Sequence, residues 1–567
     1  MKKQDYFVFK NSSGSIKNVK RTLTYISVAL VGLFCLALIA LQAYHNQFLL
    51  NPDGVSYISI AQQYAHGHFT TAVNAYWSPM LSWLMAIPLW VGLNGQQAFL
   101  LVNVISAFSC LLLSSLFVWK YSKKGLMATC LYAVTLLPFL AYSAASVITP
   151  DTLVILWVIC LMWGIVGVEK ILRNESRYAD WRAAALLAVI GIFGFFIKLF
   201  LLPFFLLSLV VWYLIRVASN HKNVREAFLS IKKFDTLKLP IFTALLFIIL
   251  MAPWVTALSM KYGKIMIGSA FAYTTAANDP NYPGQPETYQ LLPPPNTNAY
   301  DAWEDPTVLP YEHYTPTSNV GGIKHFIKTR FENLPLLLDR INELSPFMIG
   351  AFLTVLLVLC LKRSAYKDKL SVLIPMILFL CYSFGYFLVL KANARYLWPL
   401  FVLLLSAGVI PAGSIFGKLK GLRKGFIVVI LLLVPFVEWL NYGPRLTLTG
   451  PVNENFLHAQ SVRMKSAAAI PSGSTIAANS FHFSNGFAYY LDTKSEGTIN
   501  PKAKEDYSQI HSQLRKHNVQ YFISVESESV GQYYATFGHV TYKKEISARY
   551  CTPTSSGQCE IQVVKLY

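Results

Sequence analysis

The sequence is dominated by apolar runs that are long enough to cross a lipid bilayer. A membrane-spanning helix needs about 20 mostly apolar residues. Charged residues make up only 13% of the 567-residue chain and hydrophobic residues 54%, which excludes a soluble globular protein. The sequence therefore predicts an α-helical polytopic membrane protein with about 11 transmembrane helices, at 22–43, 98–119, 126–145, 152–168, 183–197, 199–215, 240–258, 347–361, 371–390, 397–416 and 425–440.

The distribution of positive charge predicts how these helices are oriented. Of the 48 Lys and Arg residues, 27 lie in six clusters that fall on one side of the membrane if eleven helices cross it, whereas residues 43–119 contain none. The positive-inside rule then places the N-terminus in the cytoplasm and the C-terminus outside. A further apolar stretch, 78–93, must lie in the interface or re-enter, because a full crossing would move Lys120 and its basic neighbours outside.

The same reading divides the chain into three parts. Residues 1–21 form a cytoplasmic arm, 22–440 a transmembrane domain with external loops at 44–97 and 259–346, and 441–567 an external soluble domain. Strand-like runs and one expected helix alternate in that last part, which predicts a small α/β fold, with strands at 475–478, 521–525 and 561–564 and the helix at 503–517.

Two cysteines of this external part, Cys551 and Cys559, suit a disulfide in an oxidising compartment, and free thiols remain open.

Four ionisable residues are predicted at the external helix ends, although they lie far apart in the sequence. They are Asp53, Asp151, Lys198 and Arg395. A charge at membrane depth costs about 2.5–3.5 kcal/mol, so such residues are functional candidates. Each carboxylate also has a structural interpretation: Asp53 as the N-cap of the following helix, and Asp151 as a helix-start residue after Thr149 and Pro150.

The two cations point to an anion more directly. Lys198 is the single charge in residues 183–215, a run too long for one span, so two helices should meet near it. Arg395 begins the predicted helix 397–416, where the helix dipole disfavours a cation unless an anion such as phosphate lies between them. The alternatives are snorkelling for Lys198 and, for Arg395 with Tyr396, a lipid-headgroup anchor. Together the four charges predict one outward-facing cleft for a substrate whose phosphate is carried on a lipid tail.

Several motifs in this order resemble those of the glycosyltransferase C (GT-C) superfamily, in the bacterial branch of the protein O-mannosyltransferases and the lipid A aminoarabinose transferase. They are Pro52-Asp53-Gly54, Tyr76-Trp77-Ser78-Pro79, Thr149-Pro150-Asp151, Gly194-Phe195-Phe196-Ile197-Lys198 and Arg395-Tyr396-Leu397-Trp398-Pro399. The chain departs from the pattern at Gly54, where many relatives have a second acid, and at Ser78, where the aminoarabinose transferases have a Lys.

The resemblance implies a GT-C-like fold and an inverting transfer of a sugar from a polyprenyl-phosphate donor to an acceptor hydroxyl on the external face. Asp53 matches the general base, Asp151 is the second candidate catalytic carboxylate, and Lys198, Arg395 and Tyr396 match the donor-phosphate positions. The implied location is the bacterial inner membrane. The acceptor (a protein, lipid or glycan) and the sugar stay open.

The sequence predicts no structural metal, because His66 and His68 alone make a weak site; a divalent cation in the cleft stays open. Membrane lipids are expected partners and nucleic acid is not. The loop 259–346 is interpreted as an acceptor-side lid or as a solvated connector. Two other functions compete: a transporter or flippase of lipid-linked anionic sugars, and a non-catalytic scaffold.

Overall fold

The computed structural model describes most of the chain, in ranges separated by short gaps and a few longer ones. The described residues are 12–122, 125–173, 178–221, 225–226, 234–277, 279, 285–288, 290–312, 314–345, 348, 366–388, 393–416, 433–449, 452–499, 507–547, 550 and 559–567.

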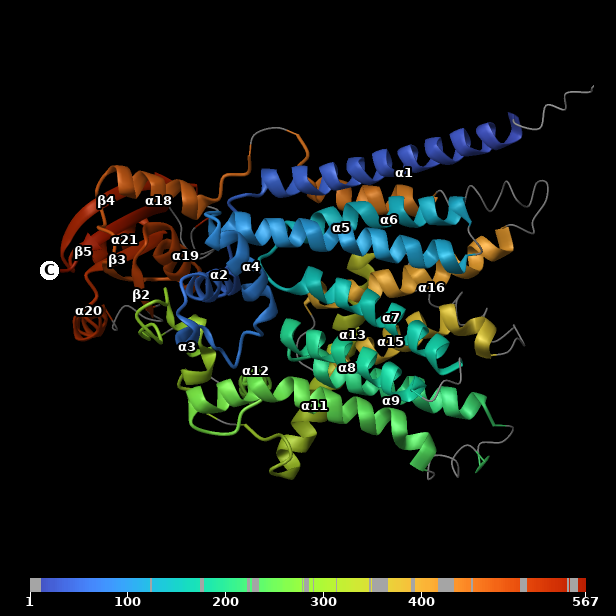
Figure 1. Cartoon of the computed structure of the whole chain (residues 1–567). Coiled ribbons are helices and arrows are strands. Elements are labelled where there is room, and N and C mark those ends of the chain that lie inside the picture. Colours follow the sequence, from blue (N-terminus) through green and yellow to red (C-terminus); the bar gives the residue numbers. More distant parts are fainter. Residues whose placement is uncertain are drawn as a thin grey trace, which may run out of the picture.

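Nine helices within the described residues are long and apolar enough to cross a membrane. They run side by side as one bundle (Figure 1), and they are α1 (Ser12–His45), α5 (Gly95–Tyr121), α6 (Leu126–Ala144), α7 (Asp151–Arg173), α8 (Ala179–Ile197), α9 (Leu201–Ser219), α11 (Phe234–Tyr262), α15 (Tyr366–Leu388) and α16 (Trp398–Phe416). The polytopic helical fold is thus confirmed. The predicted span 347–361 lies almost wholly outside the described residues, and 425–440 is described only from residue 433.

Helix α7 lies at the centre of the bundle. Of its apolar window 72% is buried, against 22% for α1. It packs closely on α8, where a Cβ added to Gly194 would lie 2.5 Å from the ring of Trp157 and one added to Gly164 would lie 2.2 Å from Ile190. Small residues of this kind let two membrane helices approach. The consequence for function is that the C-terminal end of α8 is held against the N-terminal end of α7.

Short helices cover the end of the bundle at which α7 begins. They are α2 (Pro52–Ala65), α3 (Phe69–Ala72), α4 (Met80–Trp90) and, from the second loop, α12 (Ala270–Ala276), η1 (Pro286–Thr288), η2 (Ala302–Glu304) and η3 (Pro306–Val308), followed by the long amphipathic helix α13 (Val320–Leu344). Helix α4 has 11 residues, about 16 Å at 1.5 Å per residue, which is too short to cross a bilayer. This length agrees with the prediction that 78–93 does not span.

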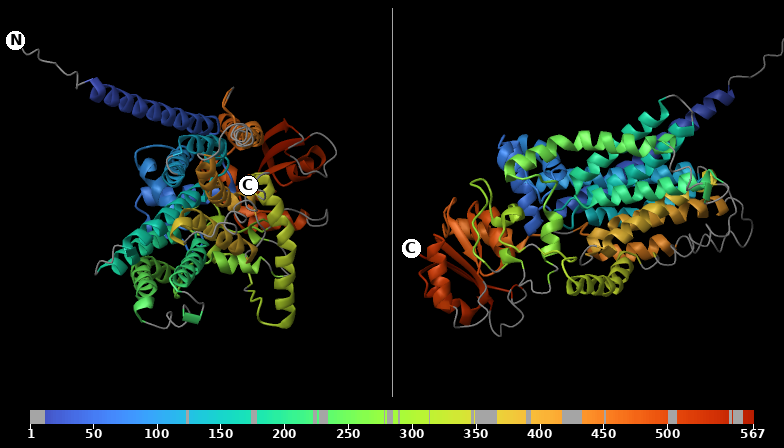
Figure 2. Two further views of the ribbon diagram at one scale, coloured as in Figure 1. Left: turned by 90° about the vertical axis from the view of Figure 1, so that its right-hand side faces the viewer. Right: turned by 90° about the horizontal axis from the view of Figure 1, so that it is seen from below.

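The C-terminal part is a small α/β domain at the same end of the bundle (Figure 2). Its five-stranded sheet has the order β2-β1-β3-β5-β4, with β1 parallel to β2 and β3 and with β5 antiparallel to β3 and β4. The elements are α18 (Phe456–Ser466), β1 (Thr475–Ala478), α19 (Phe481–Leu491), β2 (Lys494–Thr498), α20 (Tyr507–Lys516), β3 (Tyr521–Ser527), α21 (Glu528–Ala535), β4 (His539–Ile546) and β5 (Cys559–Lys565).

The predicted α/β fold of this part is correct, but β2 and β4 were not predicted from the sequence. Strand β2 is Lys-Ser-Glu-Gly-Thr, which carries no apolar alternation to identify it. Cys559 is disulfide-bonded, and Cys551 lies outside the described residues.

The second loop and the sheet domain are joined to the bundle by hydrogen bonds. Tyr489 on α19 donates to Gln96 at the start of α5 over 2.7 Å, and the Gln96 amide donates to Tyr490 over 3.1 Å. In the loop, the backbone N–H of Leu292 donates to the carbonyl of Glu496 over 2.6 Å. Three parts of the chain therefore meet over one end of the bundle.

Candidate active site

A cavity of about 660 Å³ lies where these three parts meet. All five site residues predicted from the sequence line it: Asp53, Asp151, Lys198, Arg395 and Tyr396. The sheet domain contributes Phe481, and the second loop contributes Tyr273, Glu287 and Trp303. The prediction that distant charges converge on one cleft is correct as geometry.

Arg395 lies between the two predicted carboxylates. Its Nη2 atom is 2.9 Å from Oδ2 of Asp53, and its Nε atom is 3.7 Å from Oδ2 of Asp151. Lys198 Nζ donates to the other Asp151 oxygen, Oδ1, over 2.9 Å. Two cations and two carboxylates thus form one continuous network, and their formal charges cancel.

Local sequence explains how each cation reaches this network. Lys198 follows the last residue of α8 with extended backbone angles (φ −160°, ψ 128°), so two helices do meet at this residue, as predicted. Arg395 lies in η4 (Ala394–Leu397), a 3₁₀ turn before α16 whose N-cap is Asn393; the Asn393 side chain accepts a hydrogen bond from the Arg395 backbone N–H. The turn places the guanidinium beside the first turns of α2 and α7.

The two carboxylates are not equivalent. Asp53 is in the first turn of α2, and Asn51 occupies the N-cap, so the N-cap interpretation of Asp53 is wrong. Its Oδ1 accepts a hydrogen bond from Nε1 of Trp303 over 3.3 Å. Asp151 is more enclosed, and its Oδ2 also accepts from the Thr149 hydroxyl over 2.8 Å, so both of its oxygens are occupied.

Tyr396 holds the cations by its ring. Lys198 Nζ lies 4.2 Å and the Arg395 guanidinium carbon 5.1 Å from the centroid of the Tyr396 ring, both cation–π distances. The Tyr386 ring stacks on the Tyr396 ring with a centroid distance of 5.7 Å. Burial disfavours a charged Lys198, but the Asp151 carboxylate outweighs this and raises its pKa. Because Lys198 is bound to Asp151 and Tyr396 within the cavity, its side chain does not snorkel to the lipid surface.

Packing explains why residue 54, where the chain departs from the motif that it resembles, is a Gly. A Cβ added there would lie 2.6 Å from Cβ of Ile148 and 3.0 Å from Oδ1 of Asn51. Asn51 itself accepts a hydrogen bond from the Ile148 backbone N–H over 2.9 Å, which fixes this approach. A second acid after Asp53 therefore has no room in this chain.

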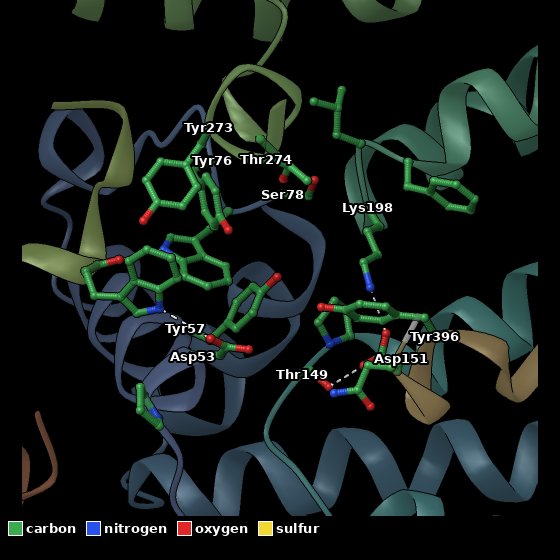
Figure 3. A pocket seen from close by; sticks show the side chains of 18 of the residues that line it. Asp53, Tyr57, Tyr76, Ser78, Thr149, Asp151, Lys198, Tyr273, Thr274 and Tyr396 are labelled. Atoms are coloured by element: carbon green, nitrogen blue, oxygen red, sulfur yellow. Dashed lines mark hydrogen bonds and ion pairs between the residues drawn. The ribbon is translucent and has the colours of Figure 1, made fainter. Parts of the chain in front are cut away.

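Three aromatic side chains that contact one another, Tyr76, Tyr273 and Trp303, form an aromatic wall of the cavity. Figure 3 shows Tyr76, Tyr273 and Asp53 on one side of the cavity and Lys198, Asp151 and Tyr396 on the other. The three wall rings lie 5.4–5.6 Å apart by centroid. Tyr76 belongs to one of the motifs that the sequence analysis identified, Tyr76-Trp77-Ser78-Pro79. The sequence analysis did not identify Tyr273, Trp303 or the adjacent Glu287, because nothing in the loop sequence distinguishes them from its other aromatic and acidic residues.

No group of three or more His, Cys, Asp or Glu residues suited to a metal ion occurs within the part of the chain that the structure describes. His66 follows α2, where its Nδ1 lies 2.8 Å from the carbonyl oxygen of Gln62. It thus has a structural partner at the helix end.

Comparison with known proteins identifies the fold. No protein family matches the sequence, and no curated protein matches it either. The structure is similar to the crystal structure of ArnT from Cupriavidus metallidurans bound to undecaprenyl phosphate, with a TM-score of 0.50 and 13% sequence identity over 96% of this chain and 98% of the other. The chain therefore has a GT-C-like membrane fold, as the motifs predicted.

Proposed function

We propose that this protein is an integral membrane glycosyltransferase that moves a sugar from a polyprenyl-phosphate donor to a hydroxyl group of an acceptor. The observation that carries the proposal is the convergence of Lys198, Arg395 and Asp53 in one cavity. A lipid phosphate needs fixed cations to become a good leaving group, and the acceptor hydroxyl needs a nearby base. The similar ArnT structure holds undecaprenyl phosphate, which supports a donor of this class.

In the proposed reaction the donor phosphate binds Lys198 and Arg395 and replaces Asp53 as the partner of Arg395. Asp53, released from its ion pair, accepts the proton of the acceptor hydroxyl. The acceptor oxygen forms a bond to C1 of the sugar as the C1–O bond to phosphate breaks. Polyprenyl phosphate leaves with the bonding electron pair, and the configuration at C1 inverts.

Asp151 has a different role in this scheme. Both of its oxygens are bound to Lys198, Arg395 and Thr149, so we assign it to positioning the two cations, where the sequence suggested a second catalytic carboxylate. Tyr396 supports the Lys198 ammonium from the ring side.

An apolar recess of about 340 Å³ between α9 and α15 suits the lipid tail of the donor. Helix α9 begins three residues after Lys198, and Tyr386 on α15 lines the charged cavity. A tail in this recess would leave the phosphate at the cations. The recess is lined by Leu207, Val211, Ile215, Leu373, Met376, Ile377, Leu380, Cys381 and Phe384.

We further propose a bacterial inner-membrane location with the N-terminus in the cytoplasm and the cavity outside, on the basis of the basic clusters. Lys198 and Arg395 supply the positive charge for the phosphate, so we expect transfer without a resident metal. Chelation of divalent cations tests this expectation, since loss of transfer on chelation would contradict it.

The proposal is tested by incubating the purified protein with a set of undecaprenyl-phosphate sugars and measuring release of undecaprenyl phosphate. We expect release with at least one sugar, and loss of release in Lys198→Met and in Arg395→Met. Lys324→Met, which removes an exposed cation on α13, is the matched control and should be as active as wild type. Movement of intact lipid-linked sugar across liposomes without release would instead identify a flippase.

A further inference from the structure

Glu287 is a buried carboxyl group that faces the cavity and has no part in the reaction described above. It belongs to η1 of the second loop and is 3% exposed. The hydroxyl group of Tyr273 lies 2.9 Å from each of its two oxygens and donates to them. Within the described residues, the Tyr273 hydroxyl and the Glu287 backbone N–H are the donors to this carboxyl group, which leaves further acceptor positions on its two oxygens.

The surroundings of Glu287 are aromatic. Tyr273 contacts both Tyr76 and Trp303, with centroid distances of 5.6 Å to each. Trp303 in turn donates to Asp53, so a continuous series of contacts runs from Glu287 through the aromatic wall to the proposed base. Figure 3 shows Lys198 across the cavity from Tyr76 and Tyr273, and Arg395 lies 2.9 Å from Asp53.

This arrangement matches the chemistry of a sugar ring. The C–H faces of a sugar are apolar and pack on aromatic rings, which prefer such contacts to water, and its hydroxyl groups donate well to a carboxyl oxygen. Each carboxyl oxygen has two acceptor positions, so Glu287 can accept from a sugar hydroxyl in addition to its partners within the protein. Burial also raises the pKa of Glu287 to about 7, although hydrogen bonds from its own backbone and from Tyr273 lower it.

We propose that Glu287, held by Tyr273 at the aromatic wall, binds hydroxyl groups of the sugar that the donor carries. This inference rests on the proposed function, since it assigns the sugar end of the same donor. The small, enclosed sugar suits this wall better than a larger acceptor does, because Glu287, Tyr273 and Trp303 are each at most 5% exposed. Glu287 is then a specificity-determining residue, and the sugar class is one with free hydroxyl groups at its end away from C1.

The test compares two ligands, undecaprenyl phosphate and a set of undecaprenyl-phosphate hexoses and pentoses. In the wild-type protein, at least one sugar should bind more tightly than the bare lipid phosphate. In Glu287→Gln, that gain should shrink by about 10- to 100-fold, which is the effect of losing one charge-assisted hydrogen bond. The affinity for bare undecaprenyl phosphate should stay unchanged. Tyr273→Phe, which keeps the ring and frees the carboxyl group, should reduce the same gain.

Glu312→Gln is the control, because Glu312 is an exposed acid of the same loop that does not line the cavity. Thermal unfolding curves show whether each variant keeps its fold. An equal loss of affinity for both ligands in Glu287→Gln would indicate a structural role and overturn the proposal, as would a wild-type protein in which no sugar adds affinity. If bare undecaprenyl phosphate does not bind at all, the proposed function itself fails.

Discussion

Replacing Asp53 with Asn should slow sugar transfer and, at the same time, strengthen the binding of undecaprenyl phosphate. Asn has nearly the same shape as Asp but cannot accept the acceptor's proton. General bases contribute about 10²- to 10⁴-fold to rate, so sugar transfer should fall by that factor. Asn also removes the negative charge that lies 2.9 Å from Arg395.

That charge competes with the donor phosphate for the same guanidinium. An Asp53 carboxylate that the phosphate has displaced from Arg395 would stay about 5 Å from that phosphate, and at an effective dielectric constant of about 20 the repulsion between the two anions is about 3 kcal/mol. The Asp53 and Arg395 side chains are 22% and 19% exposed, so solvent screening reduces the repulsion to about 1–3 kcal/mol. Asp53→Asn should therefore bind undecaprenyl phosphate about 5- to 100-fold more tightly than wild type.

The assay is a titration of the purified protein with undecaprenyl phosphate at low and high salt, combined with release of lipid phosphate from an active donor. The gain in affinity should be smaller at high salt, because the repulsion is screened. Glu312→Gln removes an exposed loop charge outside the cavity and should change neither quantity. Weaker binding of undecaprenyl phosphate by Asp53→Asn, or transfer at the wild-type rate, would refute the reasoning.

Three further changes test other parts of the structure. Asp151→Asn should weaken undecaprenyl phosphate binding in a titration, unlike Asp53→Asn, because Lys198 and Arg395 lose their shared anchor; binding as tight as in Asp53→Asn would show that Asp151 merely competes with phosphate. Gly54→Ala should lower the unfolding temperature, at a cost of about 1–3 kcal/mol, because its Cβ would lie 2.6 Å from Ile148; an unchanged temperature would contradict this packing. Burial raises the pKa of Glu304 in η2 to about 7, so the folded state favours the protonated carboxyl group. The resulting stabilisation is complete below about pH 4.5 and is lost as the pH rises through 7. In Glu304→Gln the unfolding temperature should therefore fall less steeply over that pH range, and an equally steep fall would exclude Glu304 as the cause.

Some of the site could be recognised from the sequence because each signal was local. Lys198 interrupts a long apolar run, and Arg395 stands just before another, so their positions relative to the bilayer follow from helix length alone. Asp53 and Asp151 each follow a Pro and lie in the first turn of a helix. The sequence could not reveal that Asp53 pairs with Arg395, 342 residues away, because a pairing depends on how the helices pack.

The other residues of the site could not be predicted from the sequence, because their positions also depend on tertiary packing. Glu287 and Trp303 belong to a loop with many acids and aromatic residues, and their sequence neighbours carry no periodic pattern. Their burial results from contacts with other segments, such as the hydrogen bond from Trp303 to Asp53 on α2 and the one from Tyr273 on α12 to Glu287. Strand β2 was missed because its polar residues become a strand through pairing with β1.

That this chain spans a bilayer can be read from the sequence alone, since hydrocarbon imposes a minimum length of apolar helix that can be counted residue by residue. The sequence also determined which charges stand at helix ends, because each end is marked by nearby residues. Only the packed fold shows which of those charges pair with one another and which loop side chains line the same cavity. The physical reason is that an ion pair or a ring contact depends on distances of a few ångströms between segments, and those are set by close packing such as that of Gly194 on Trp157.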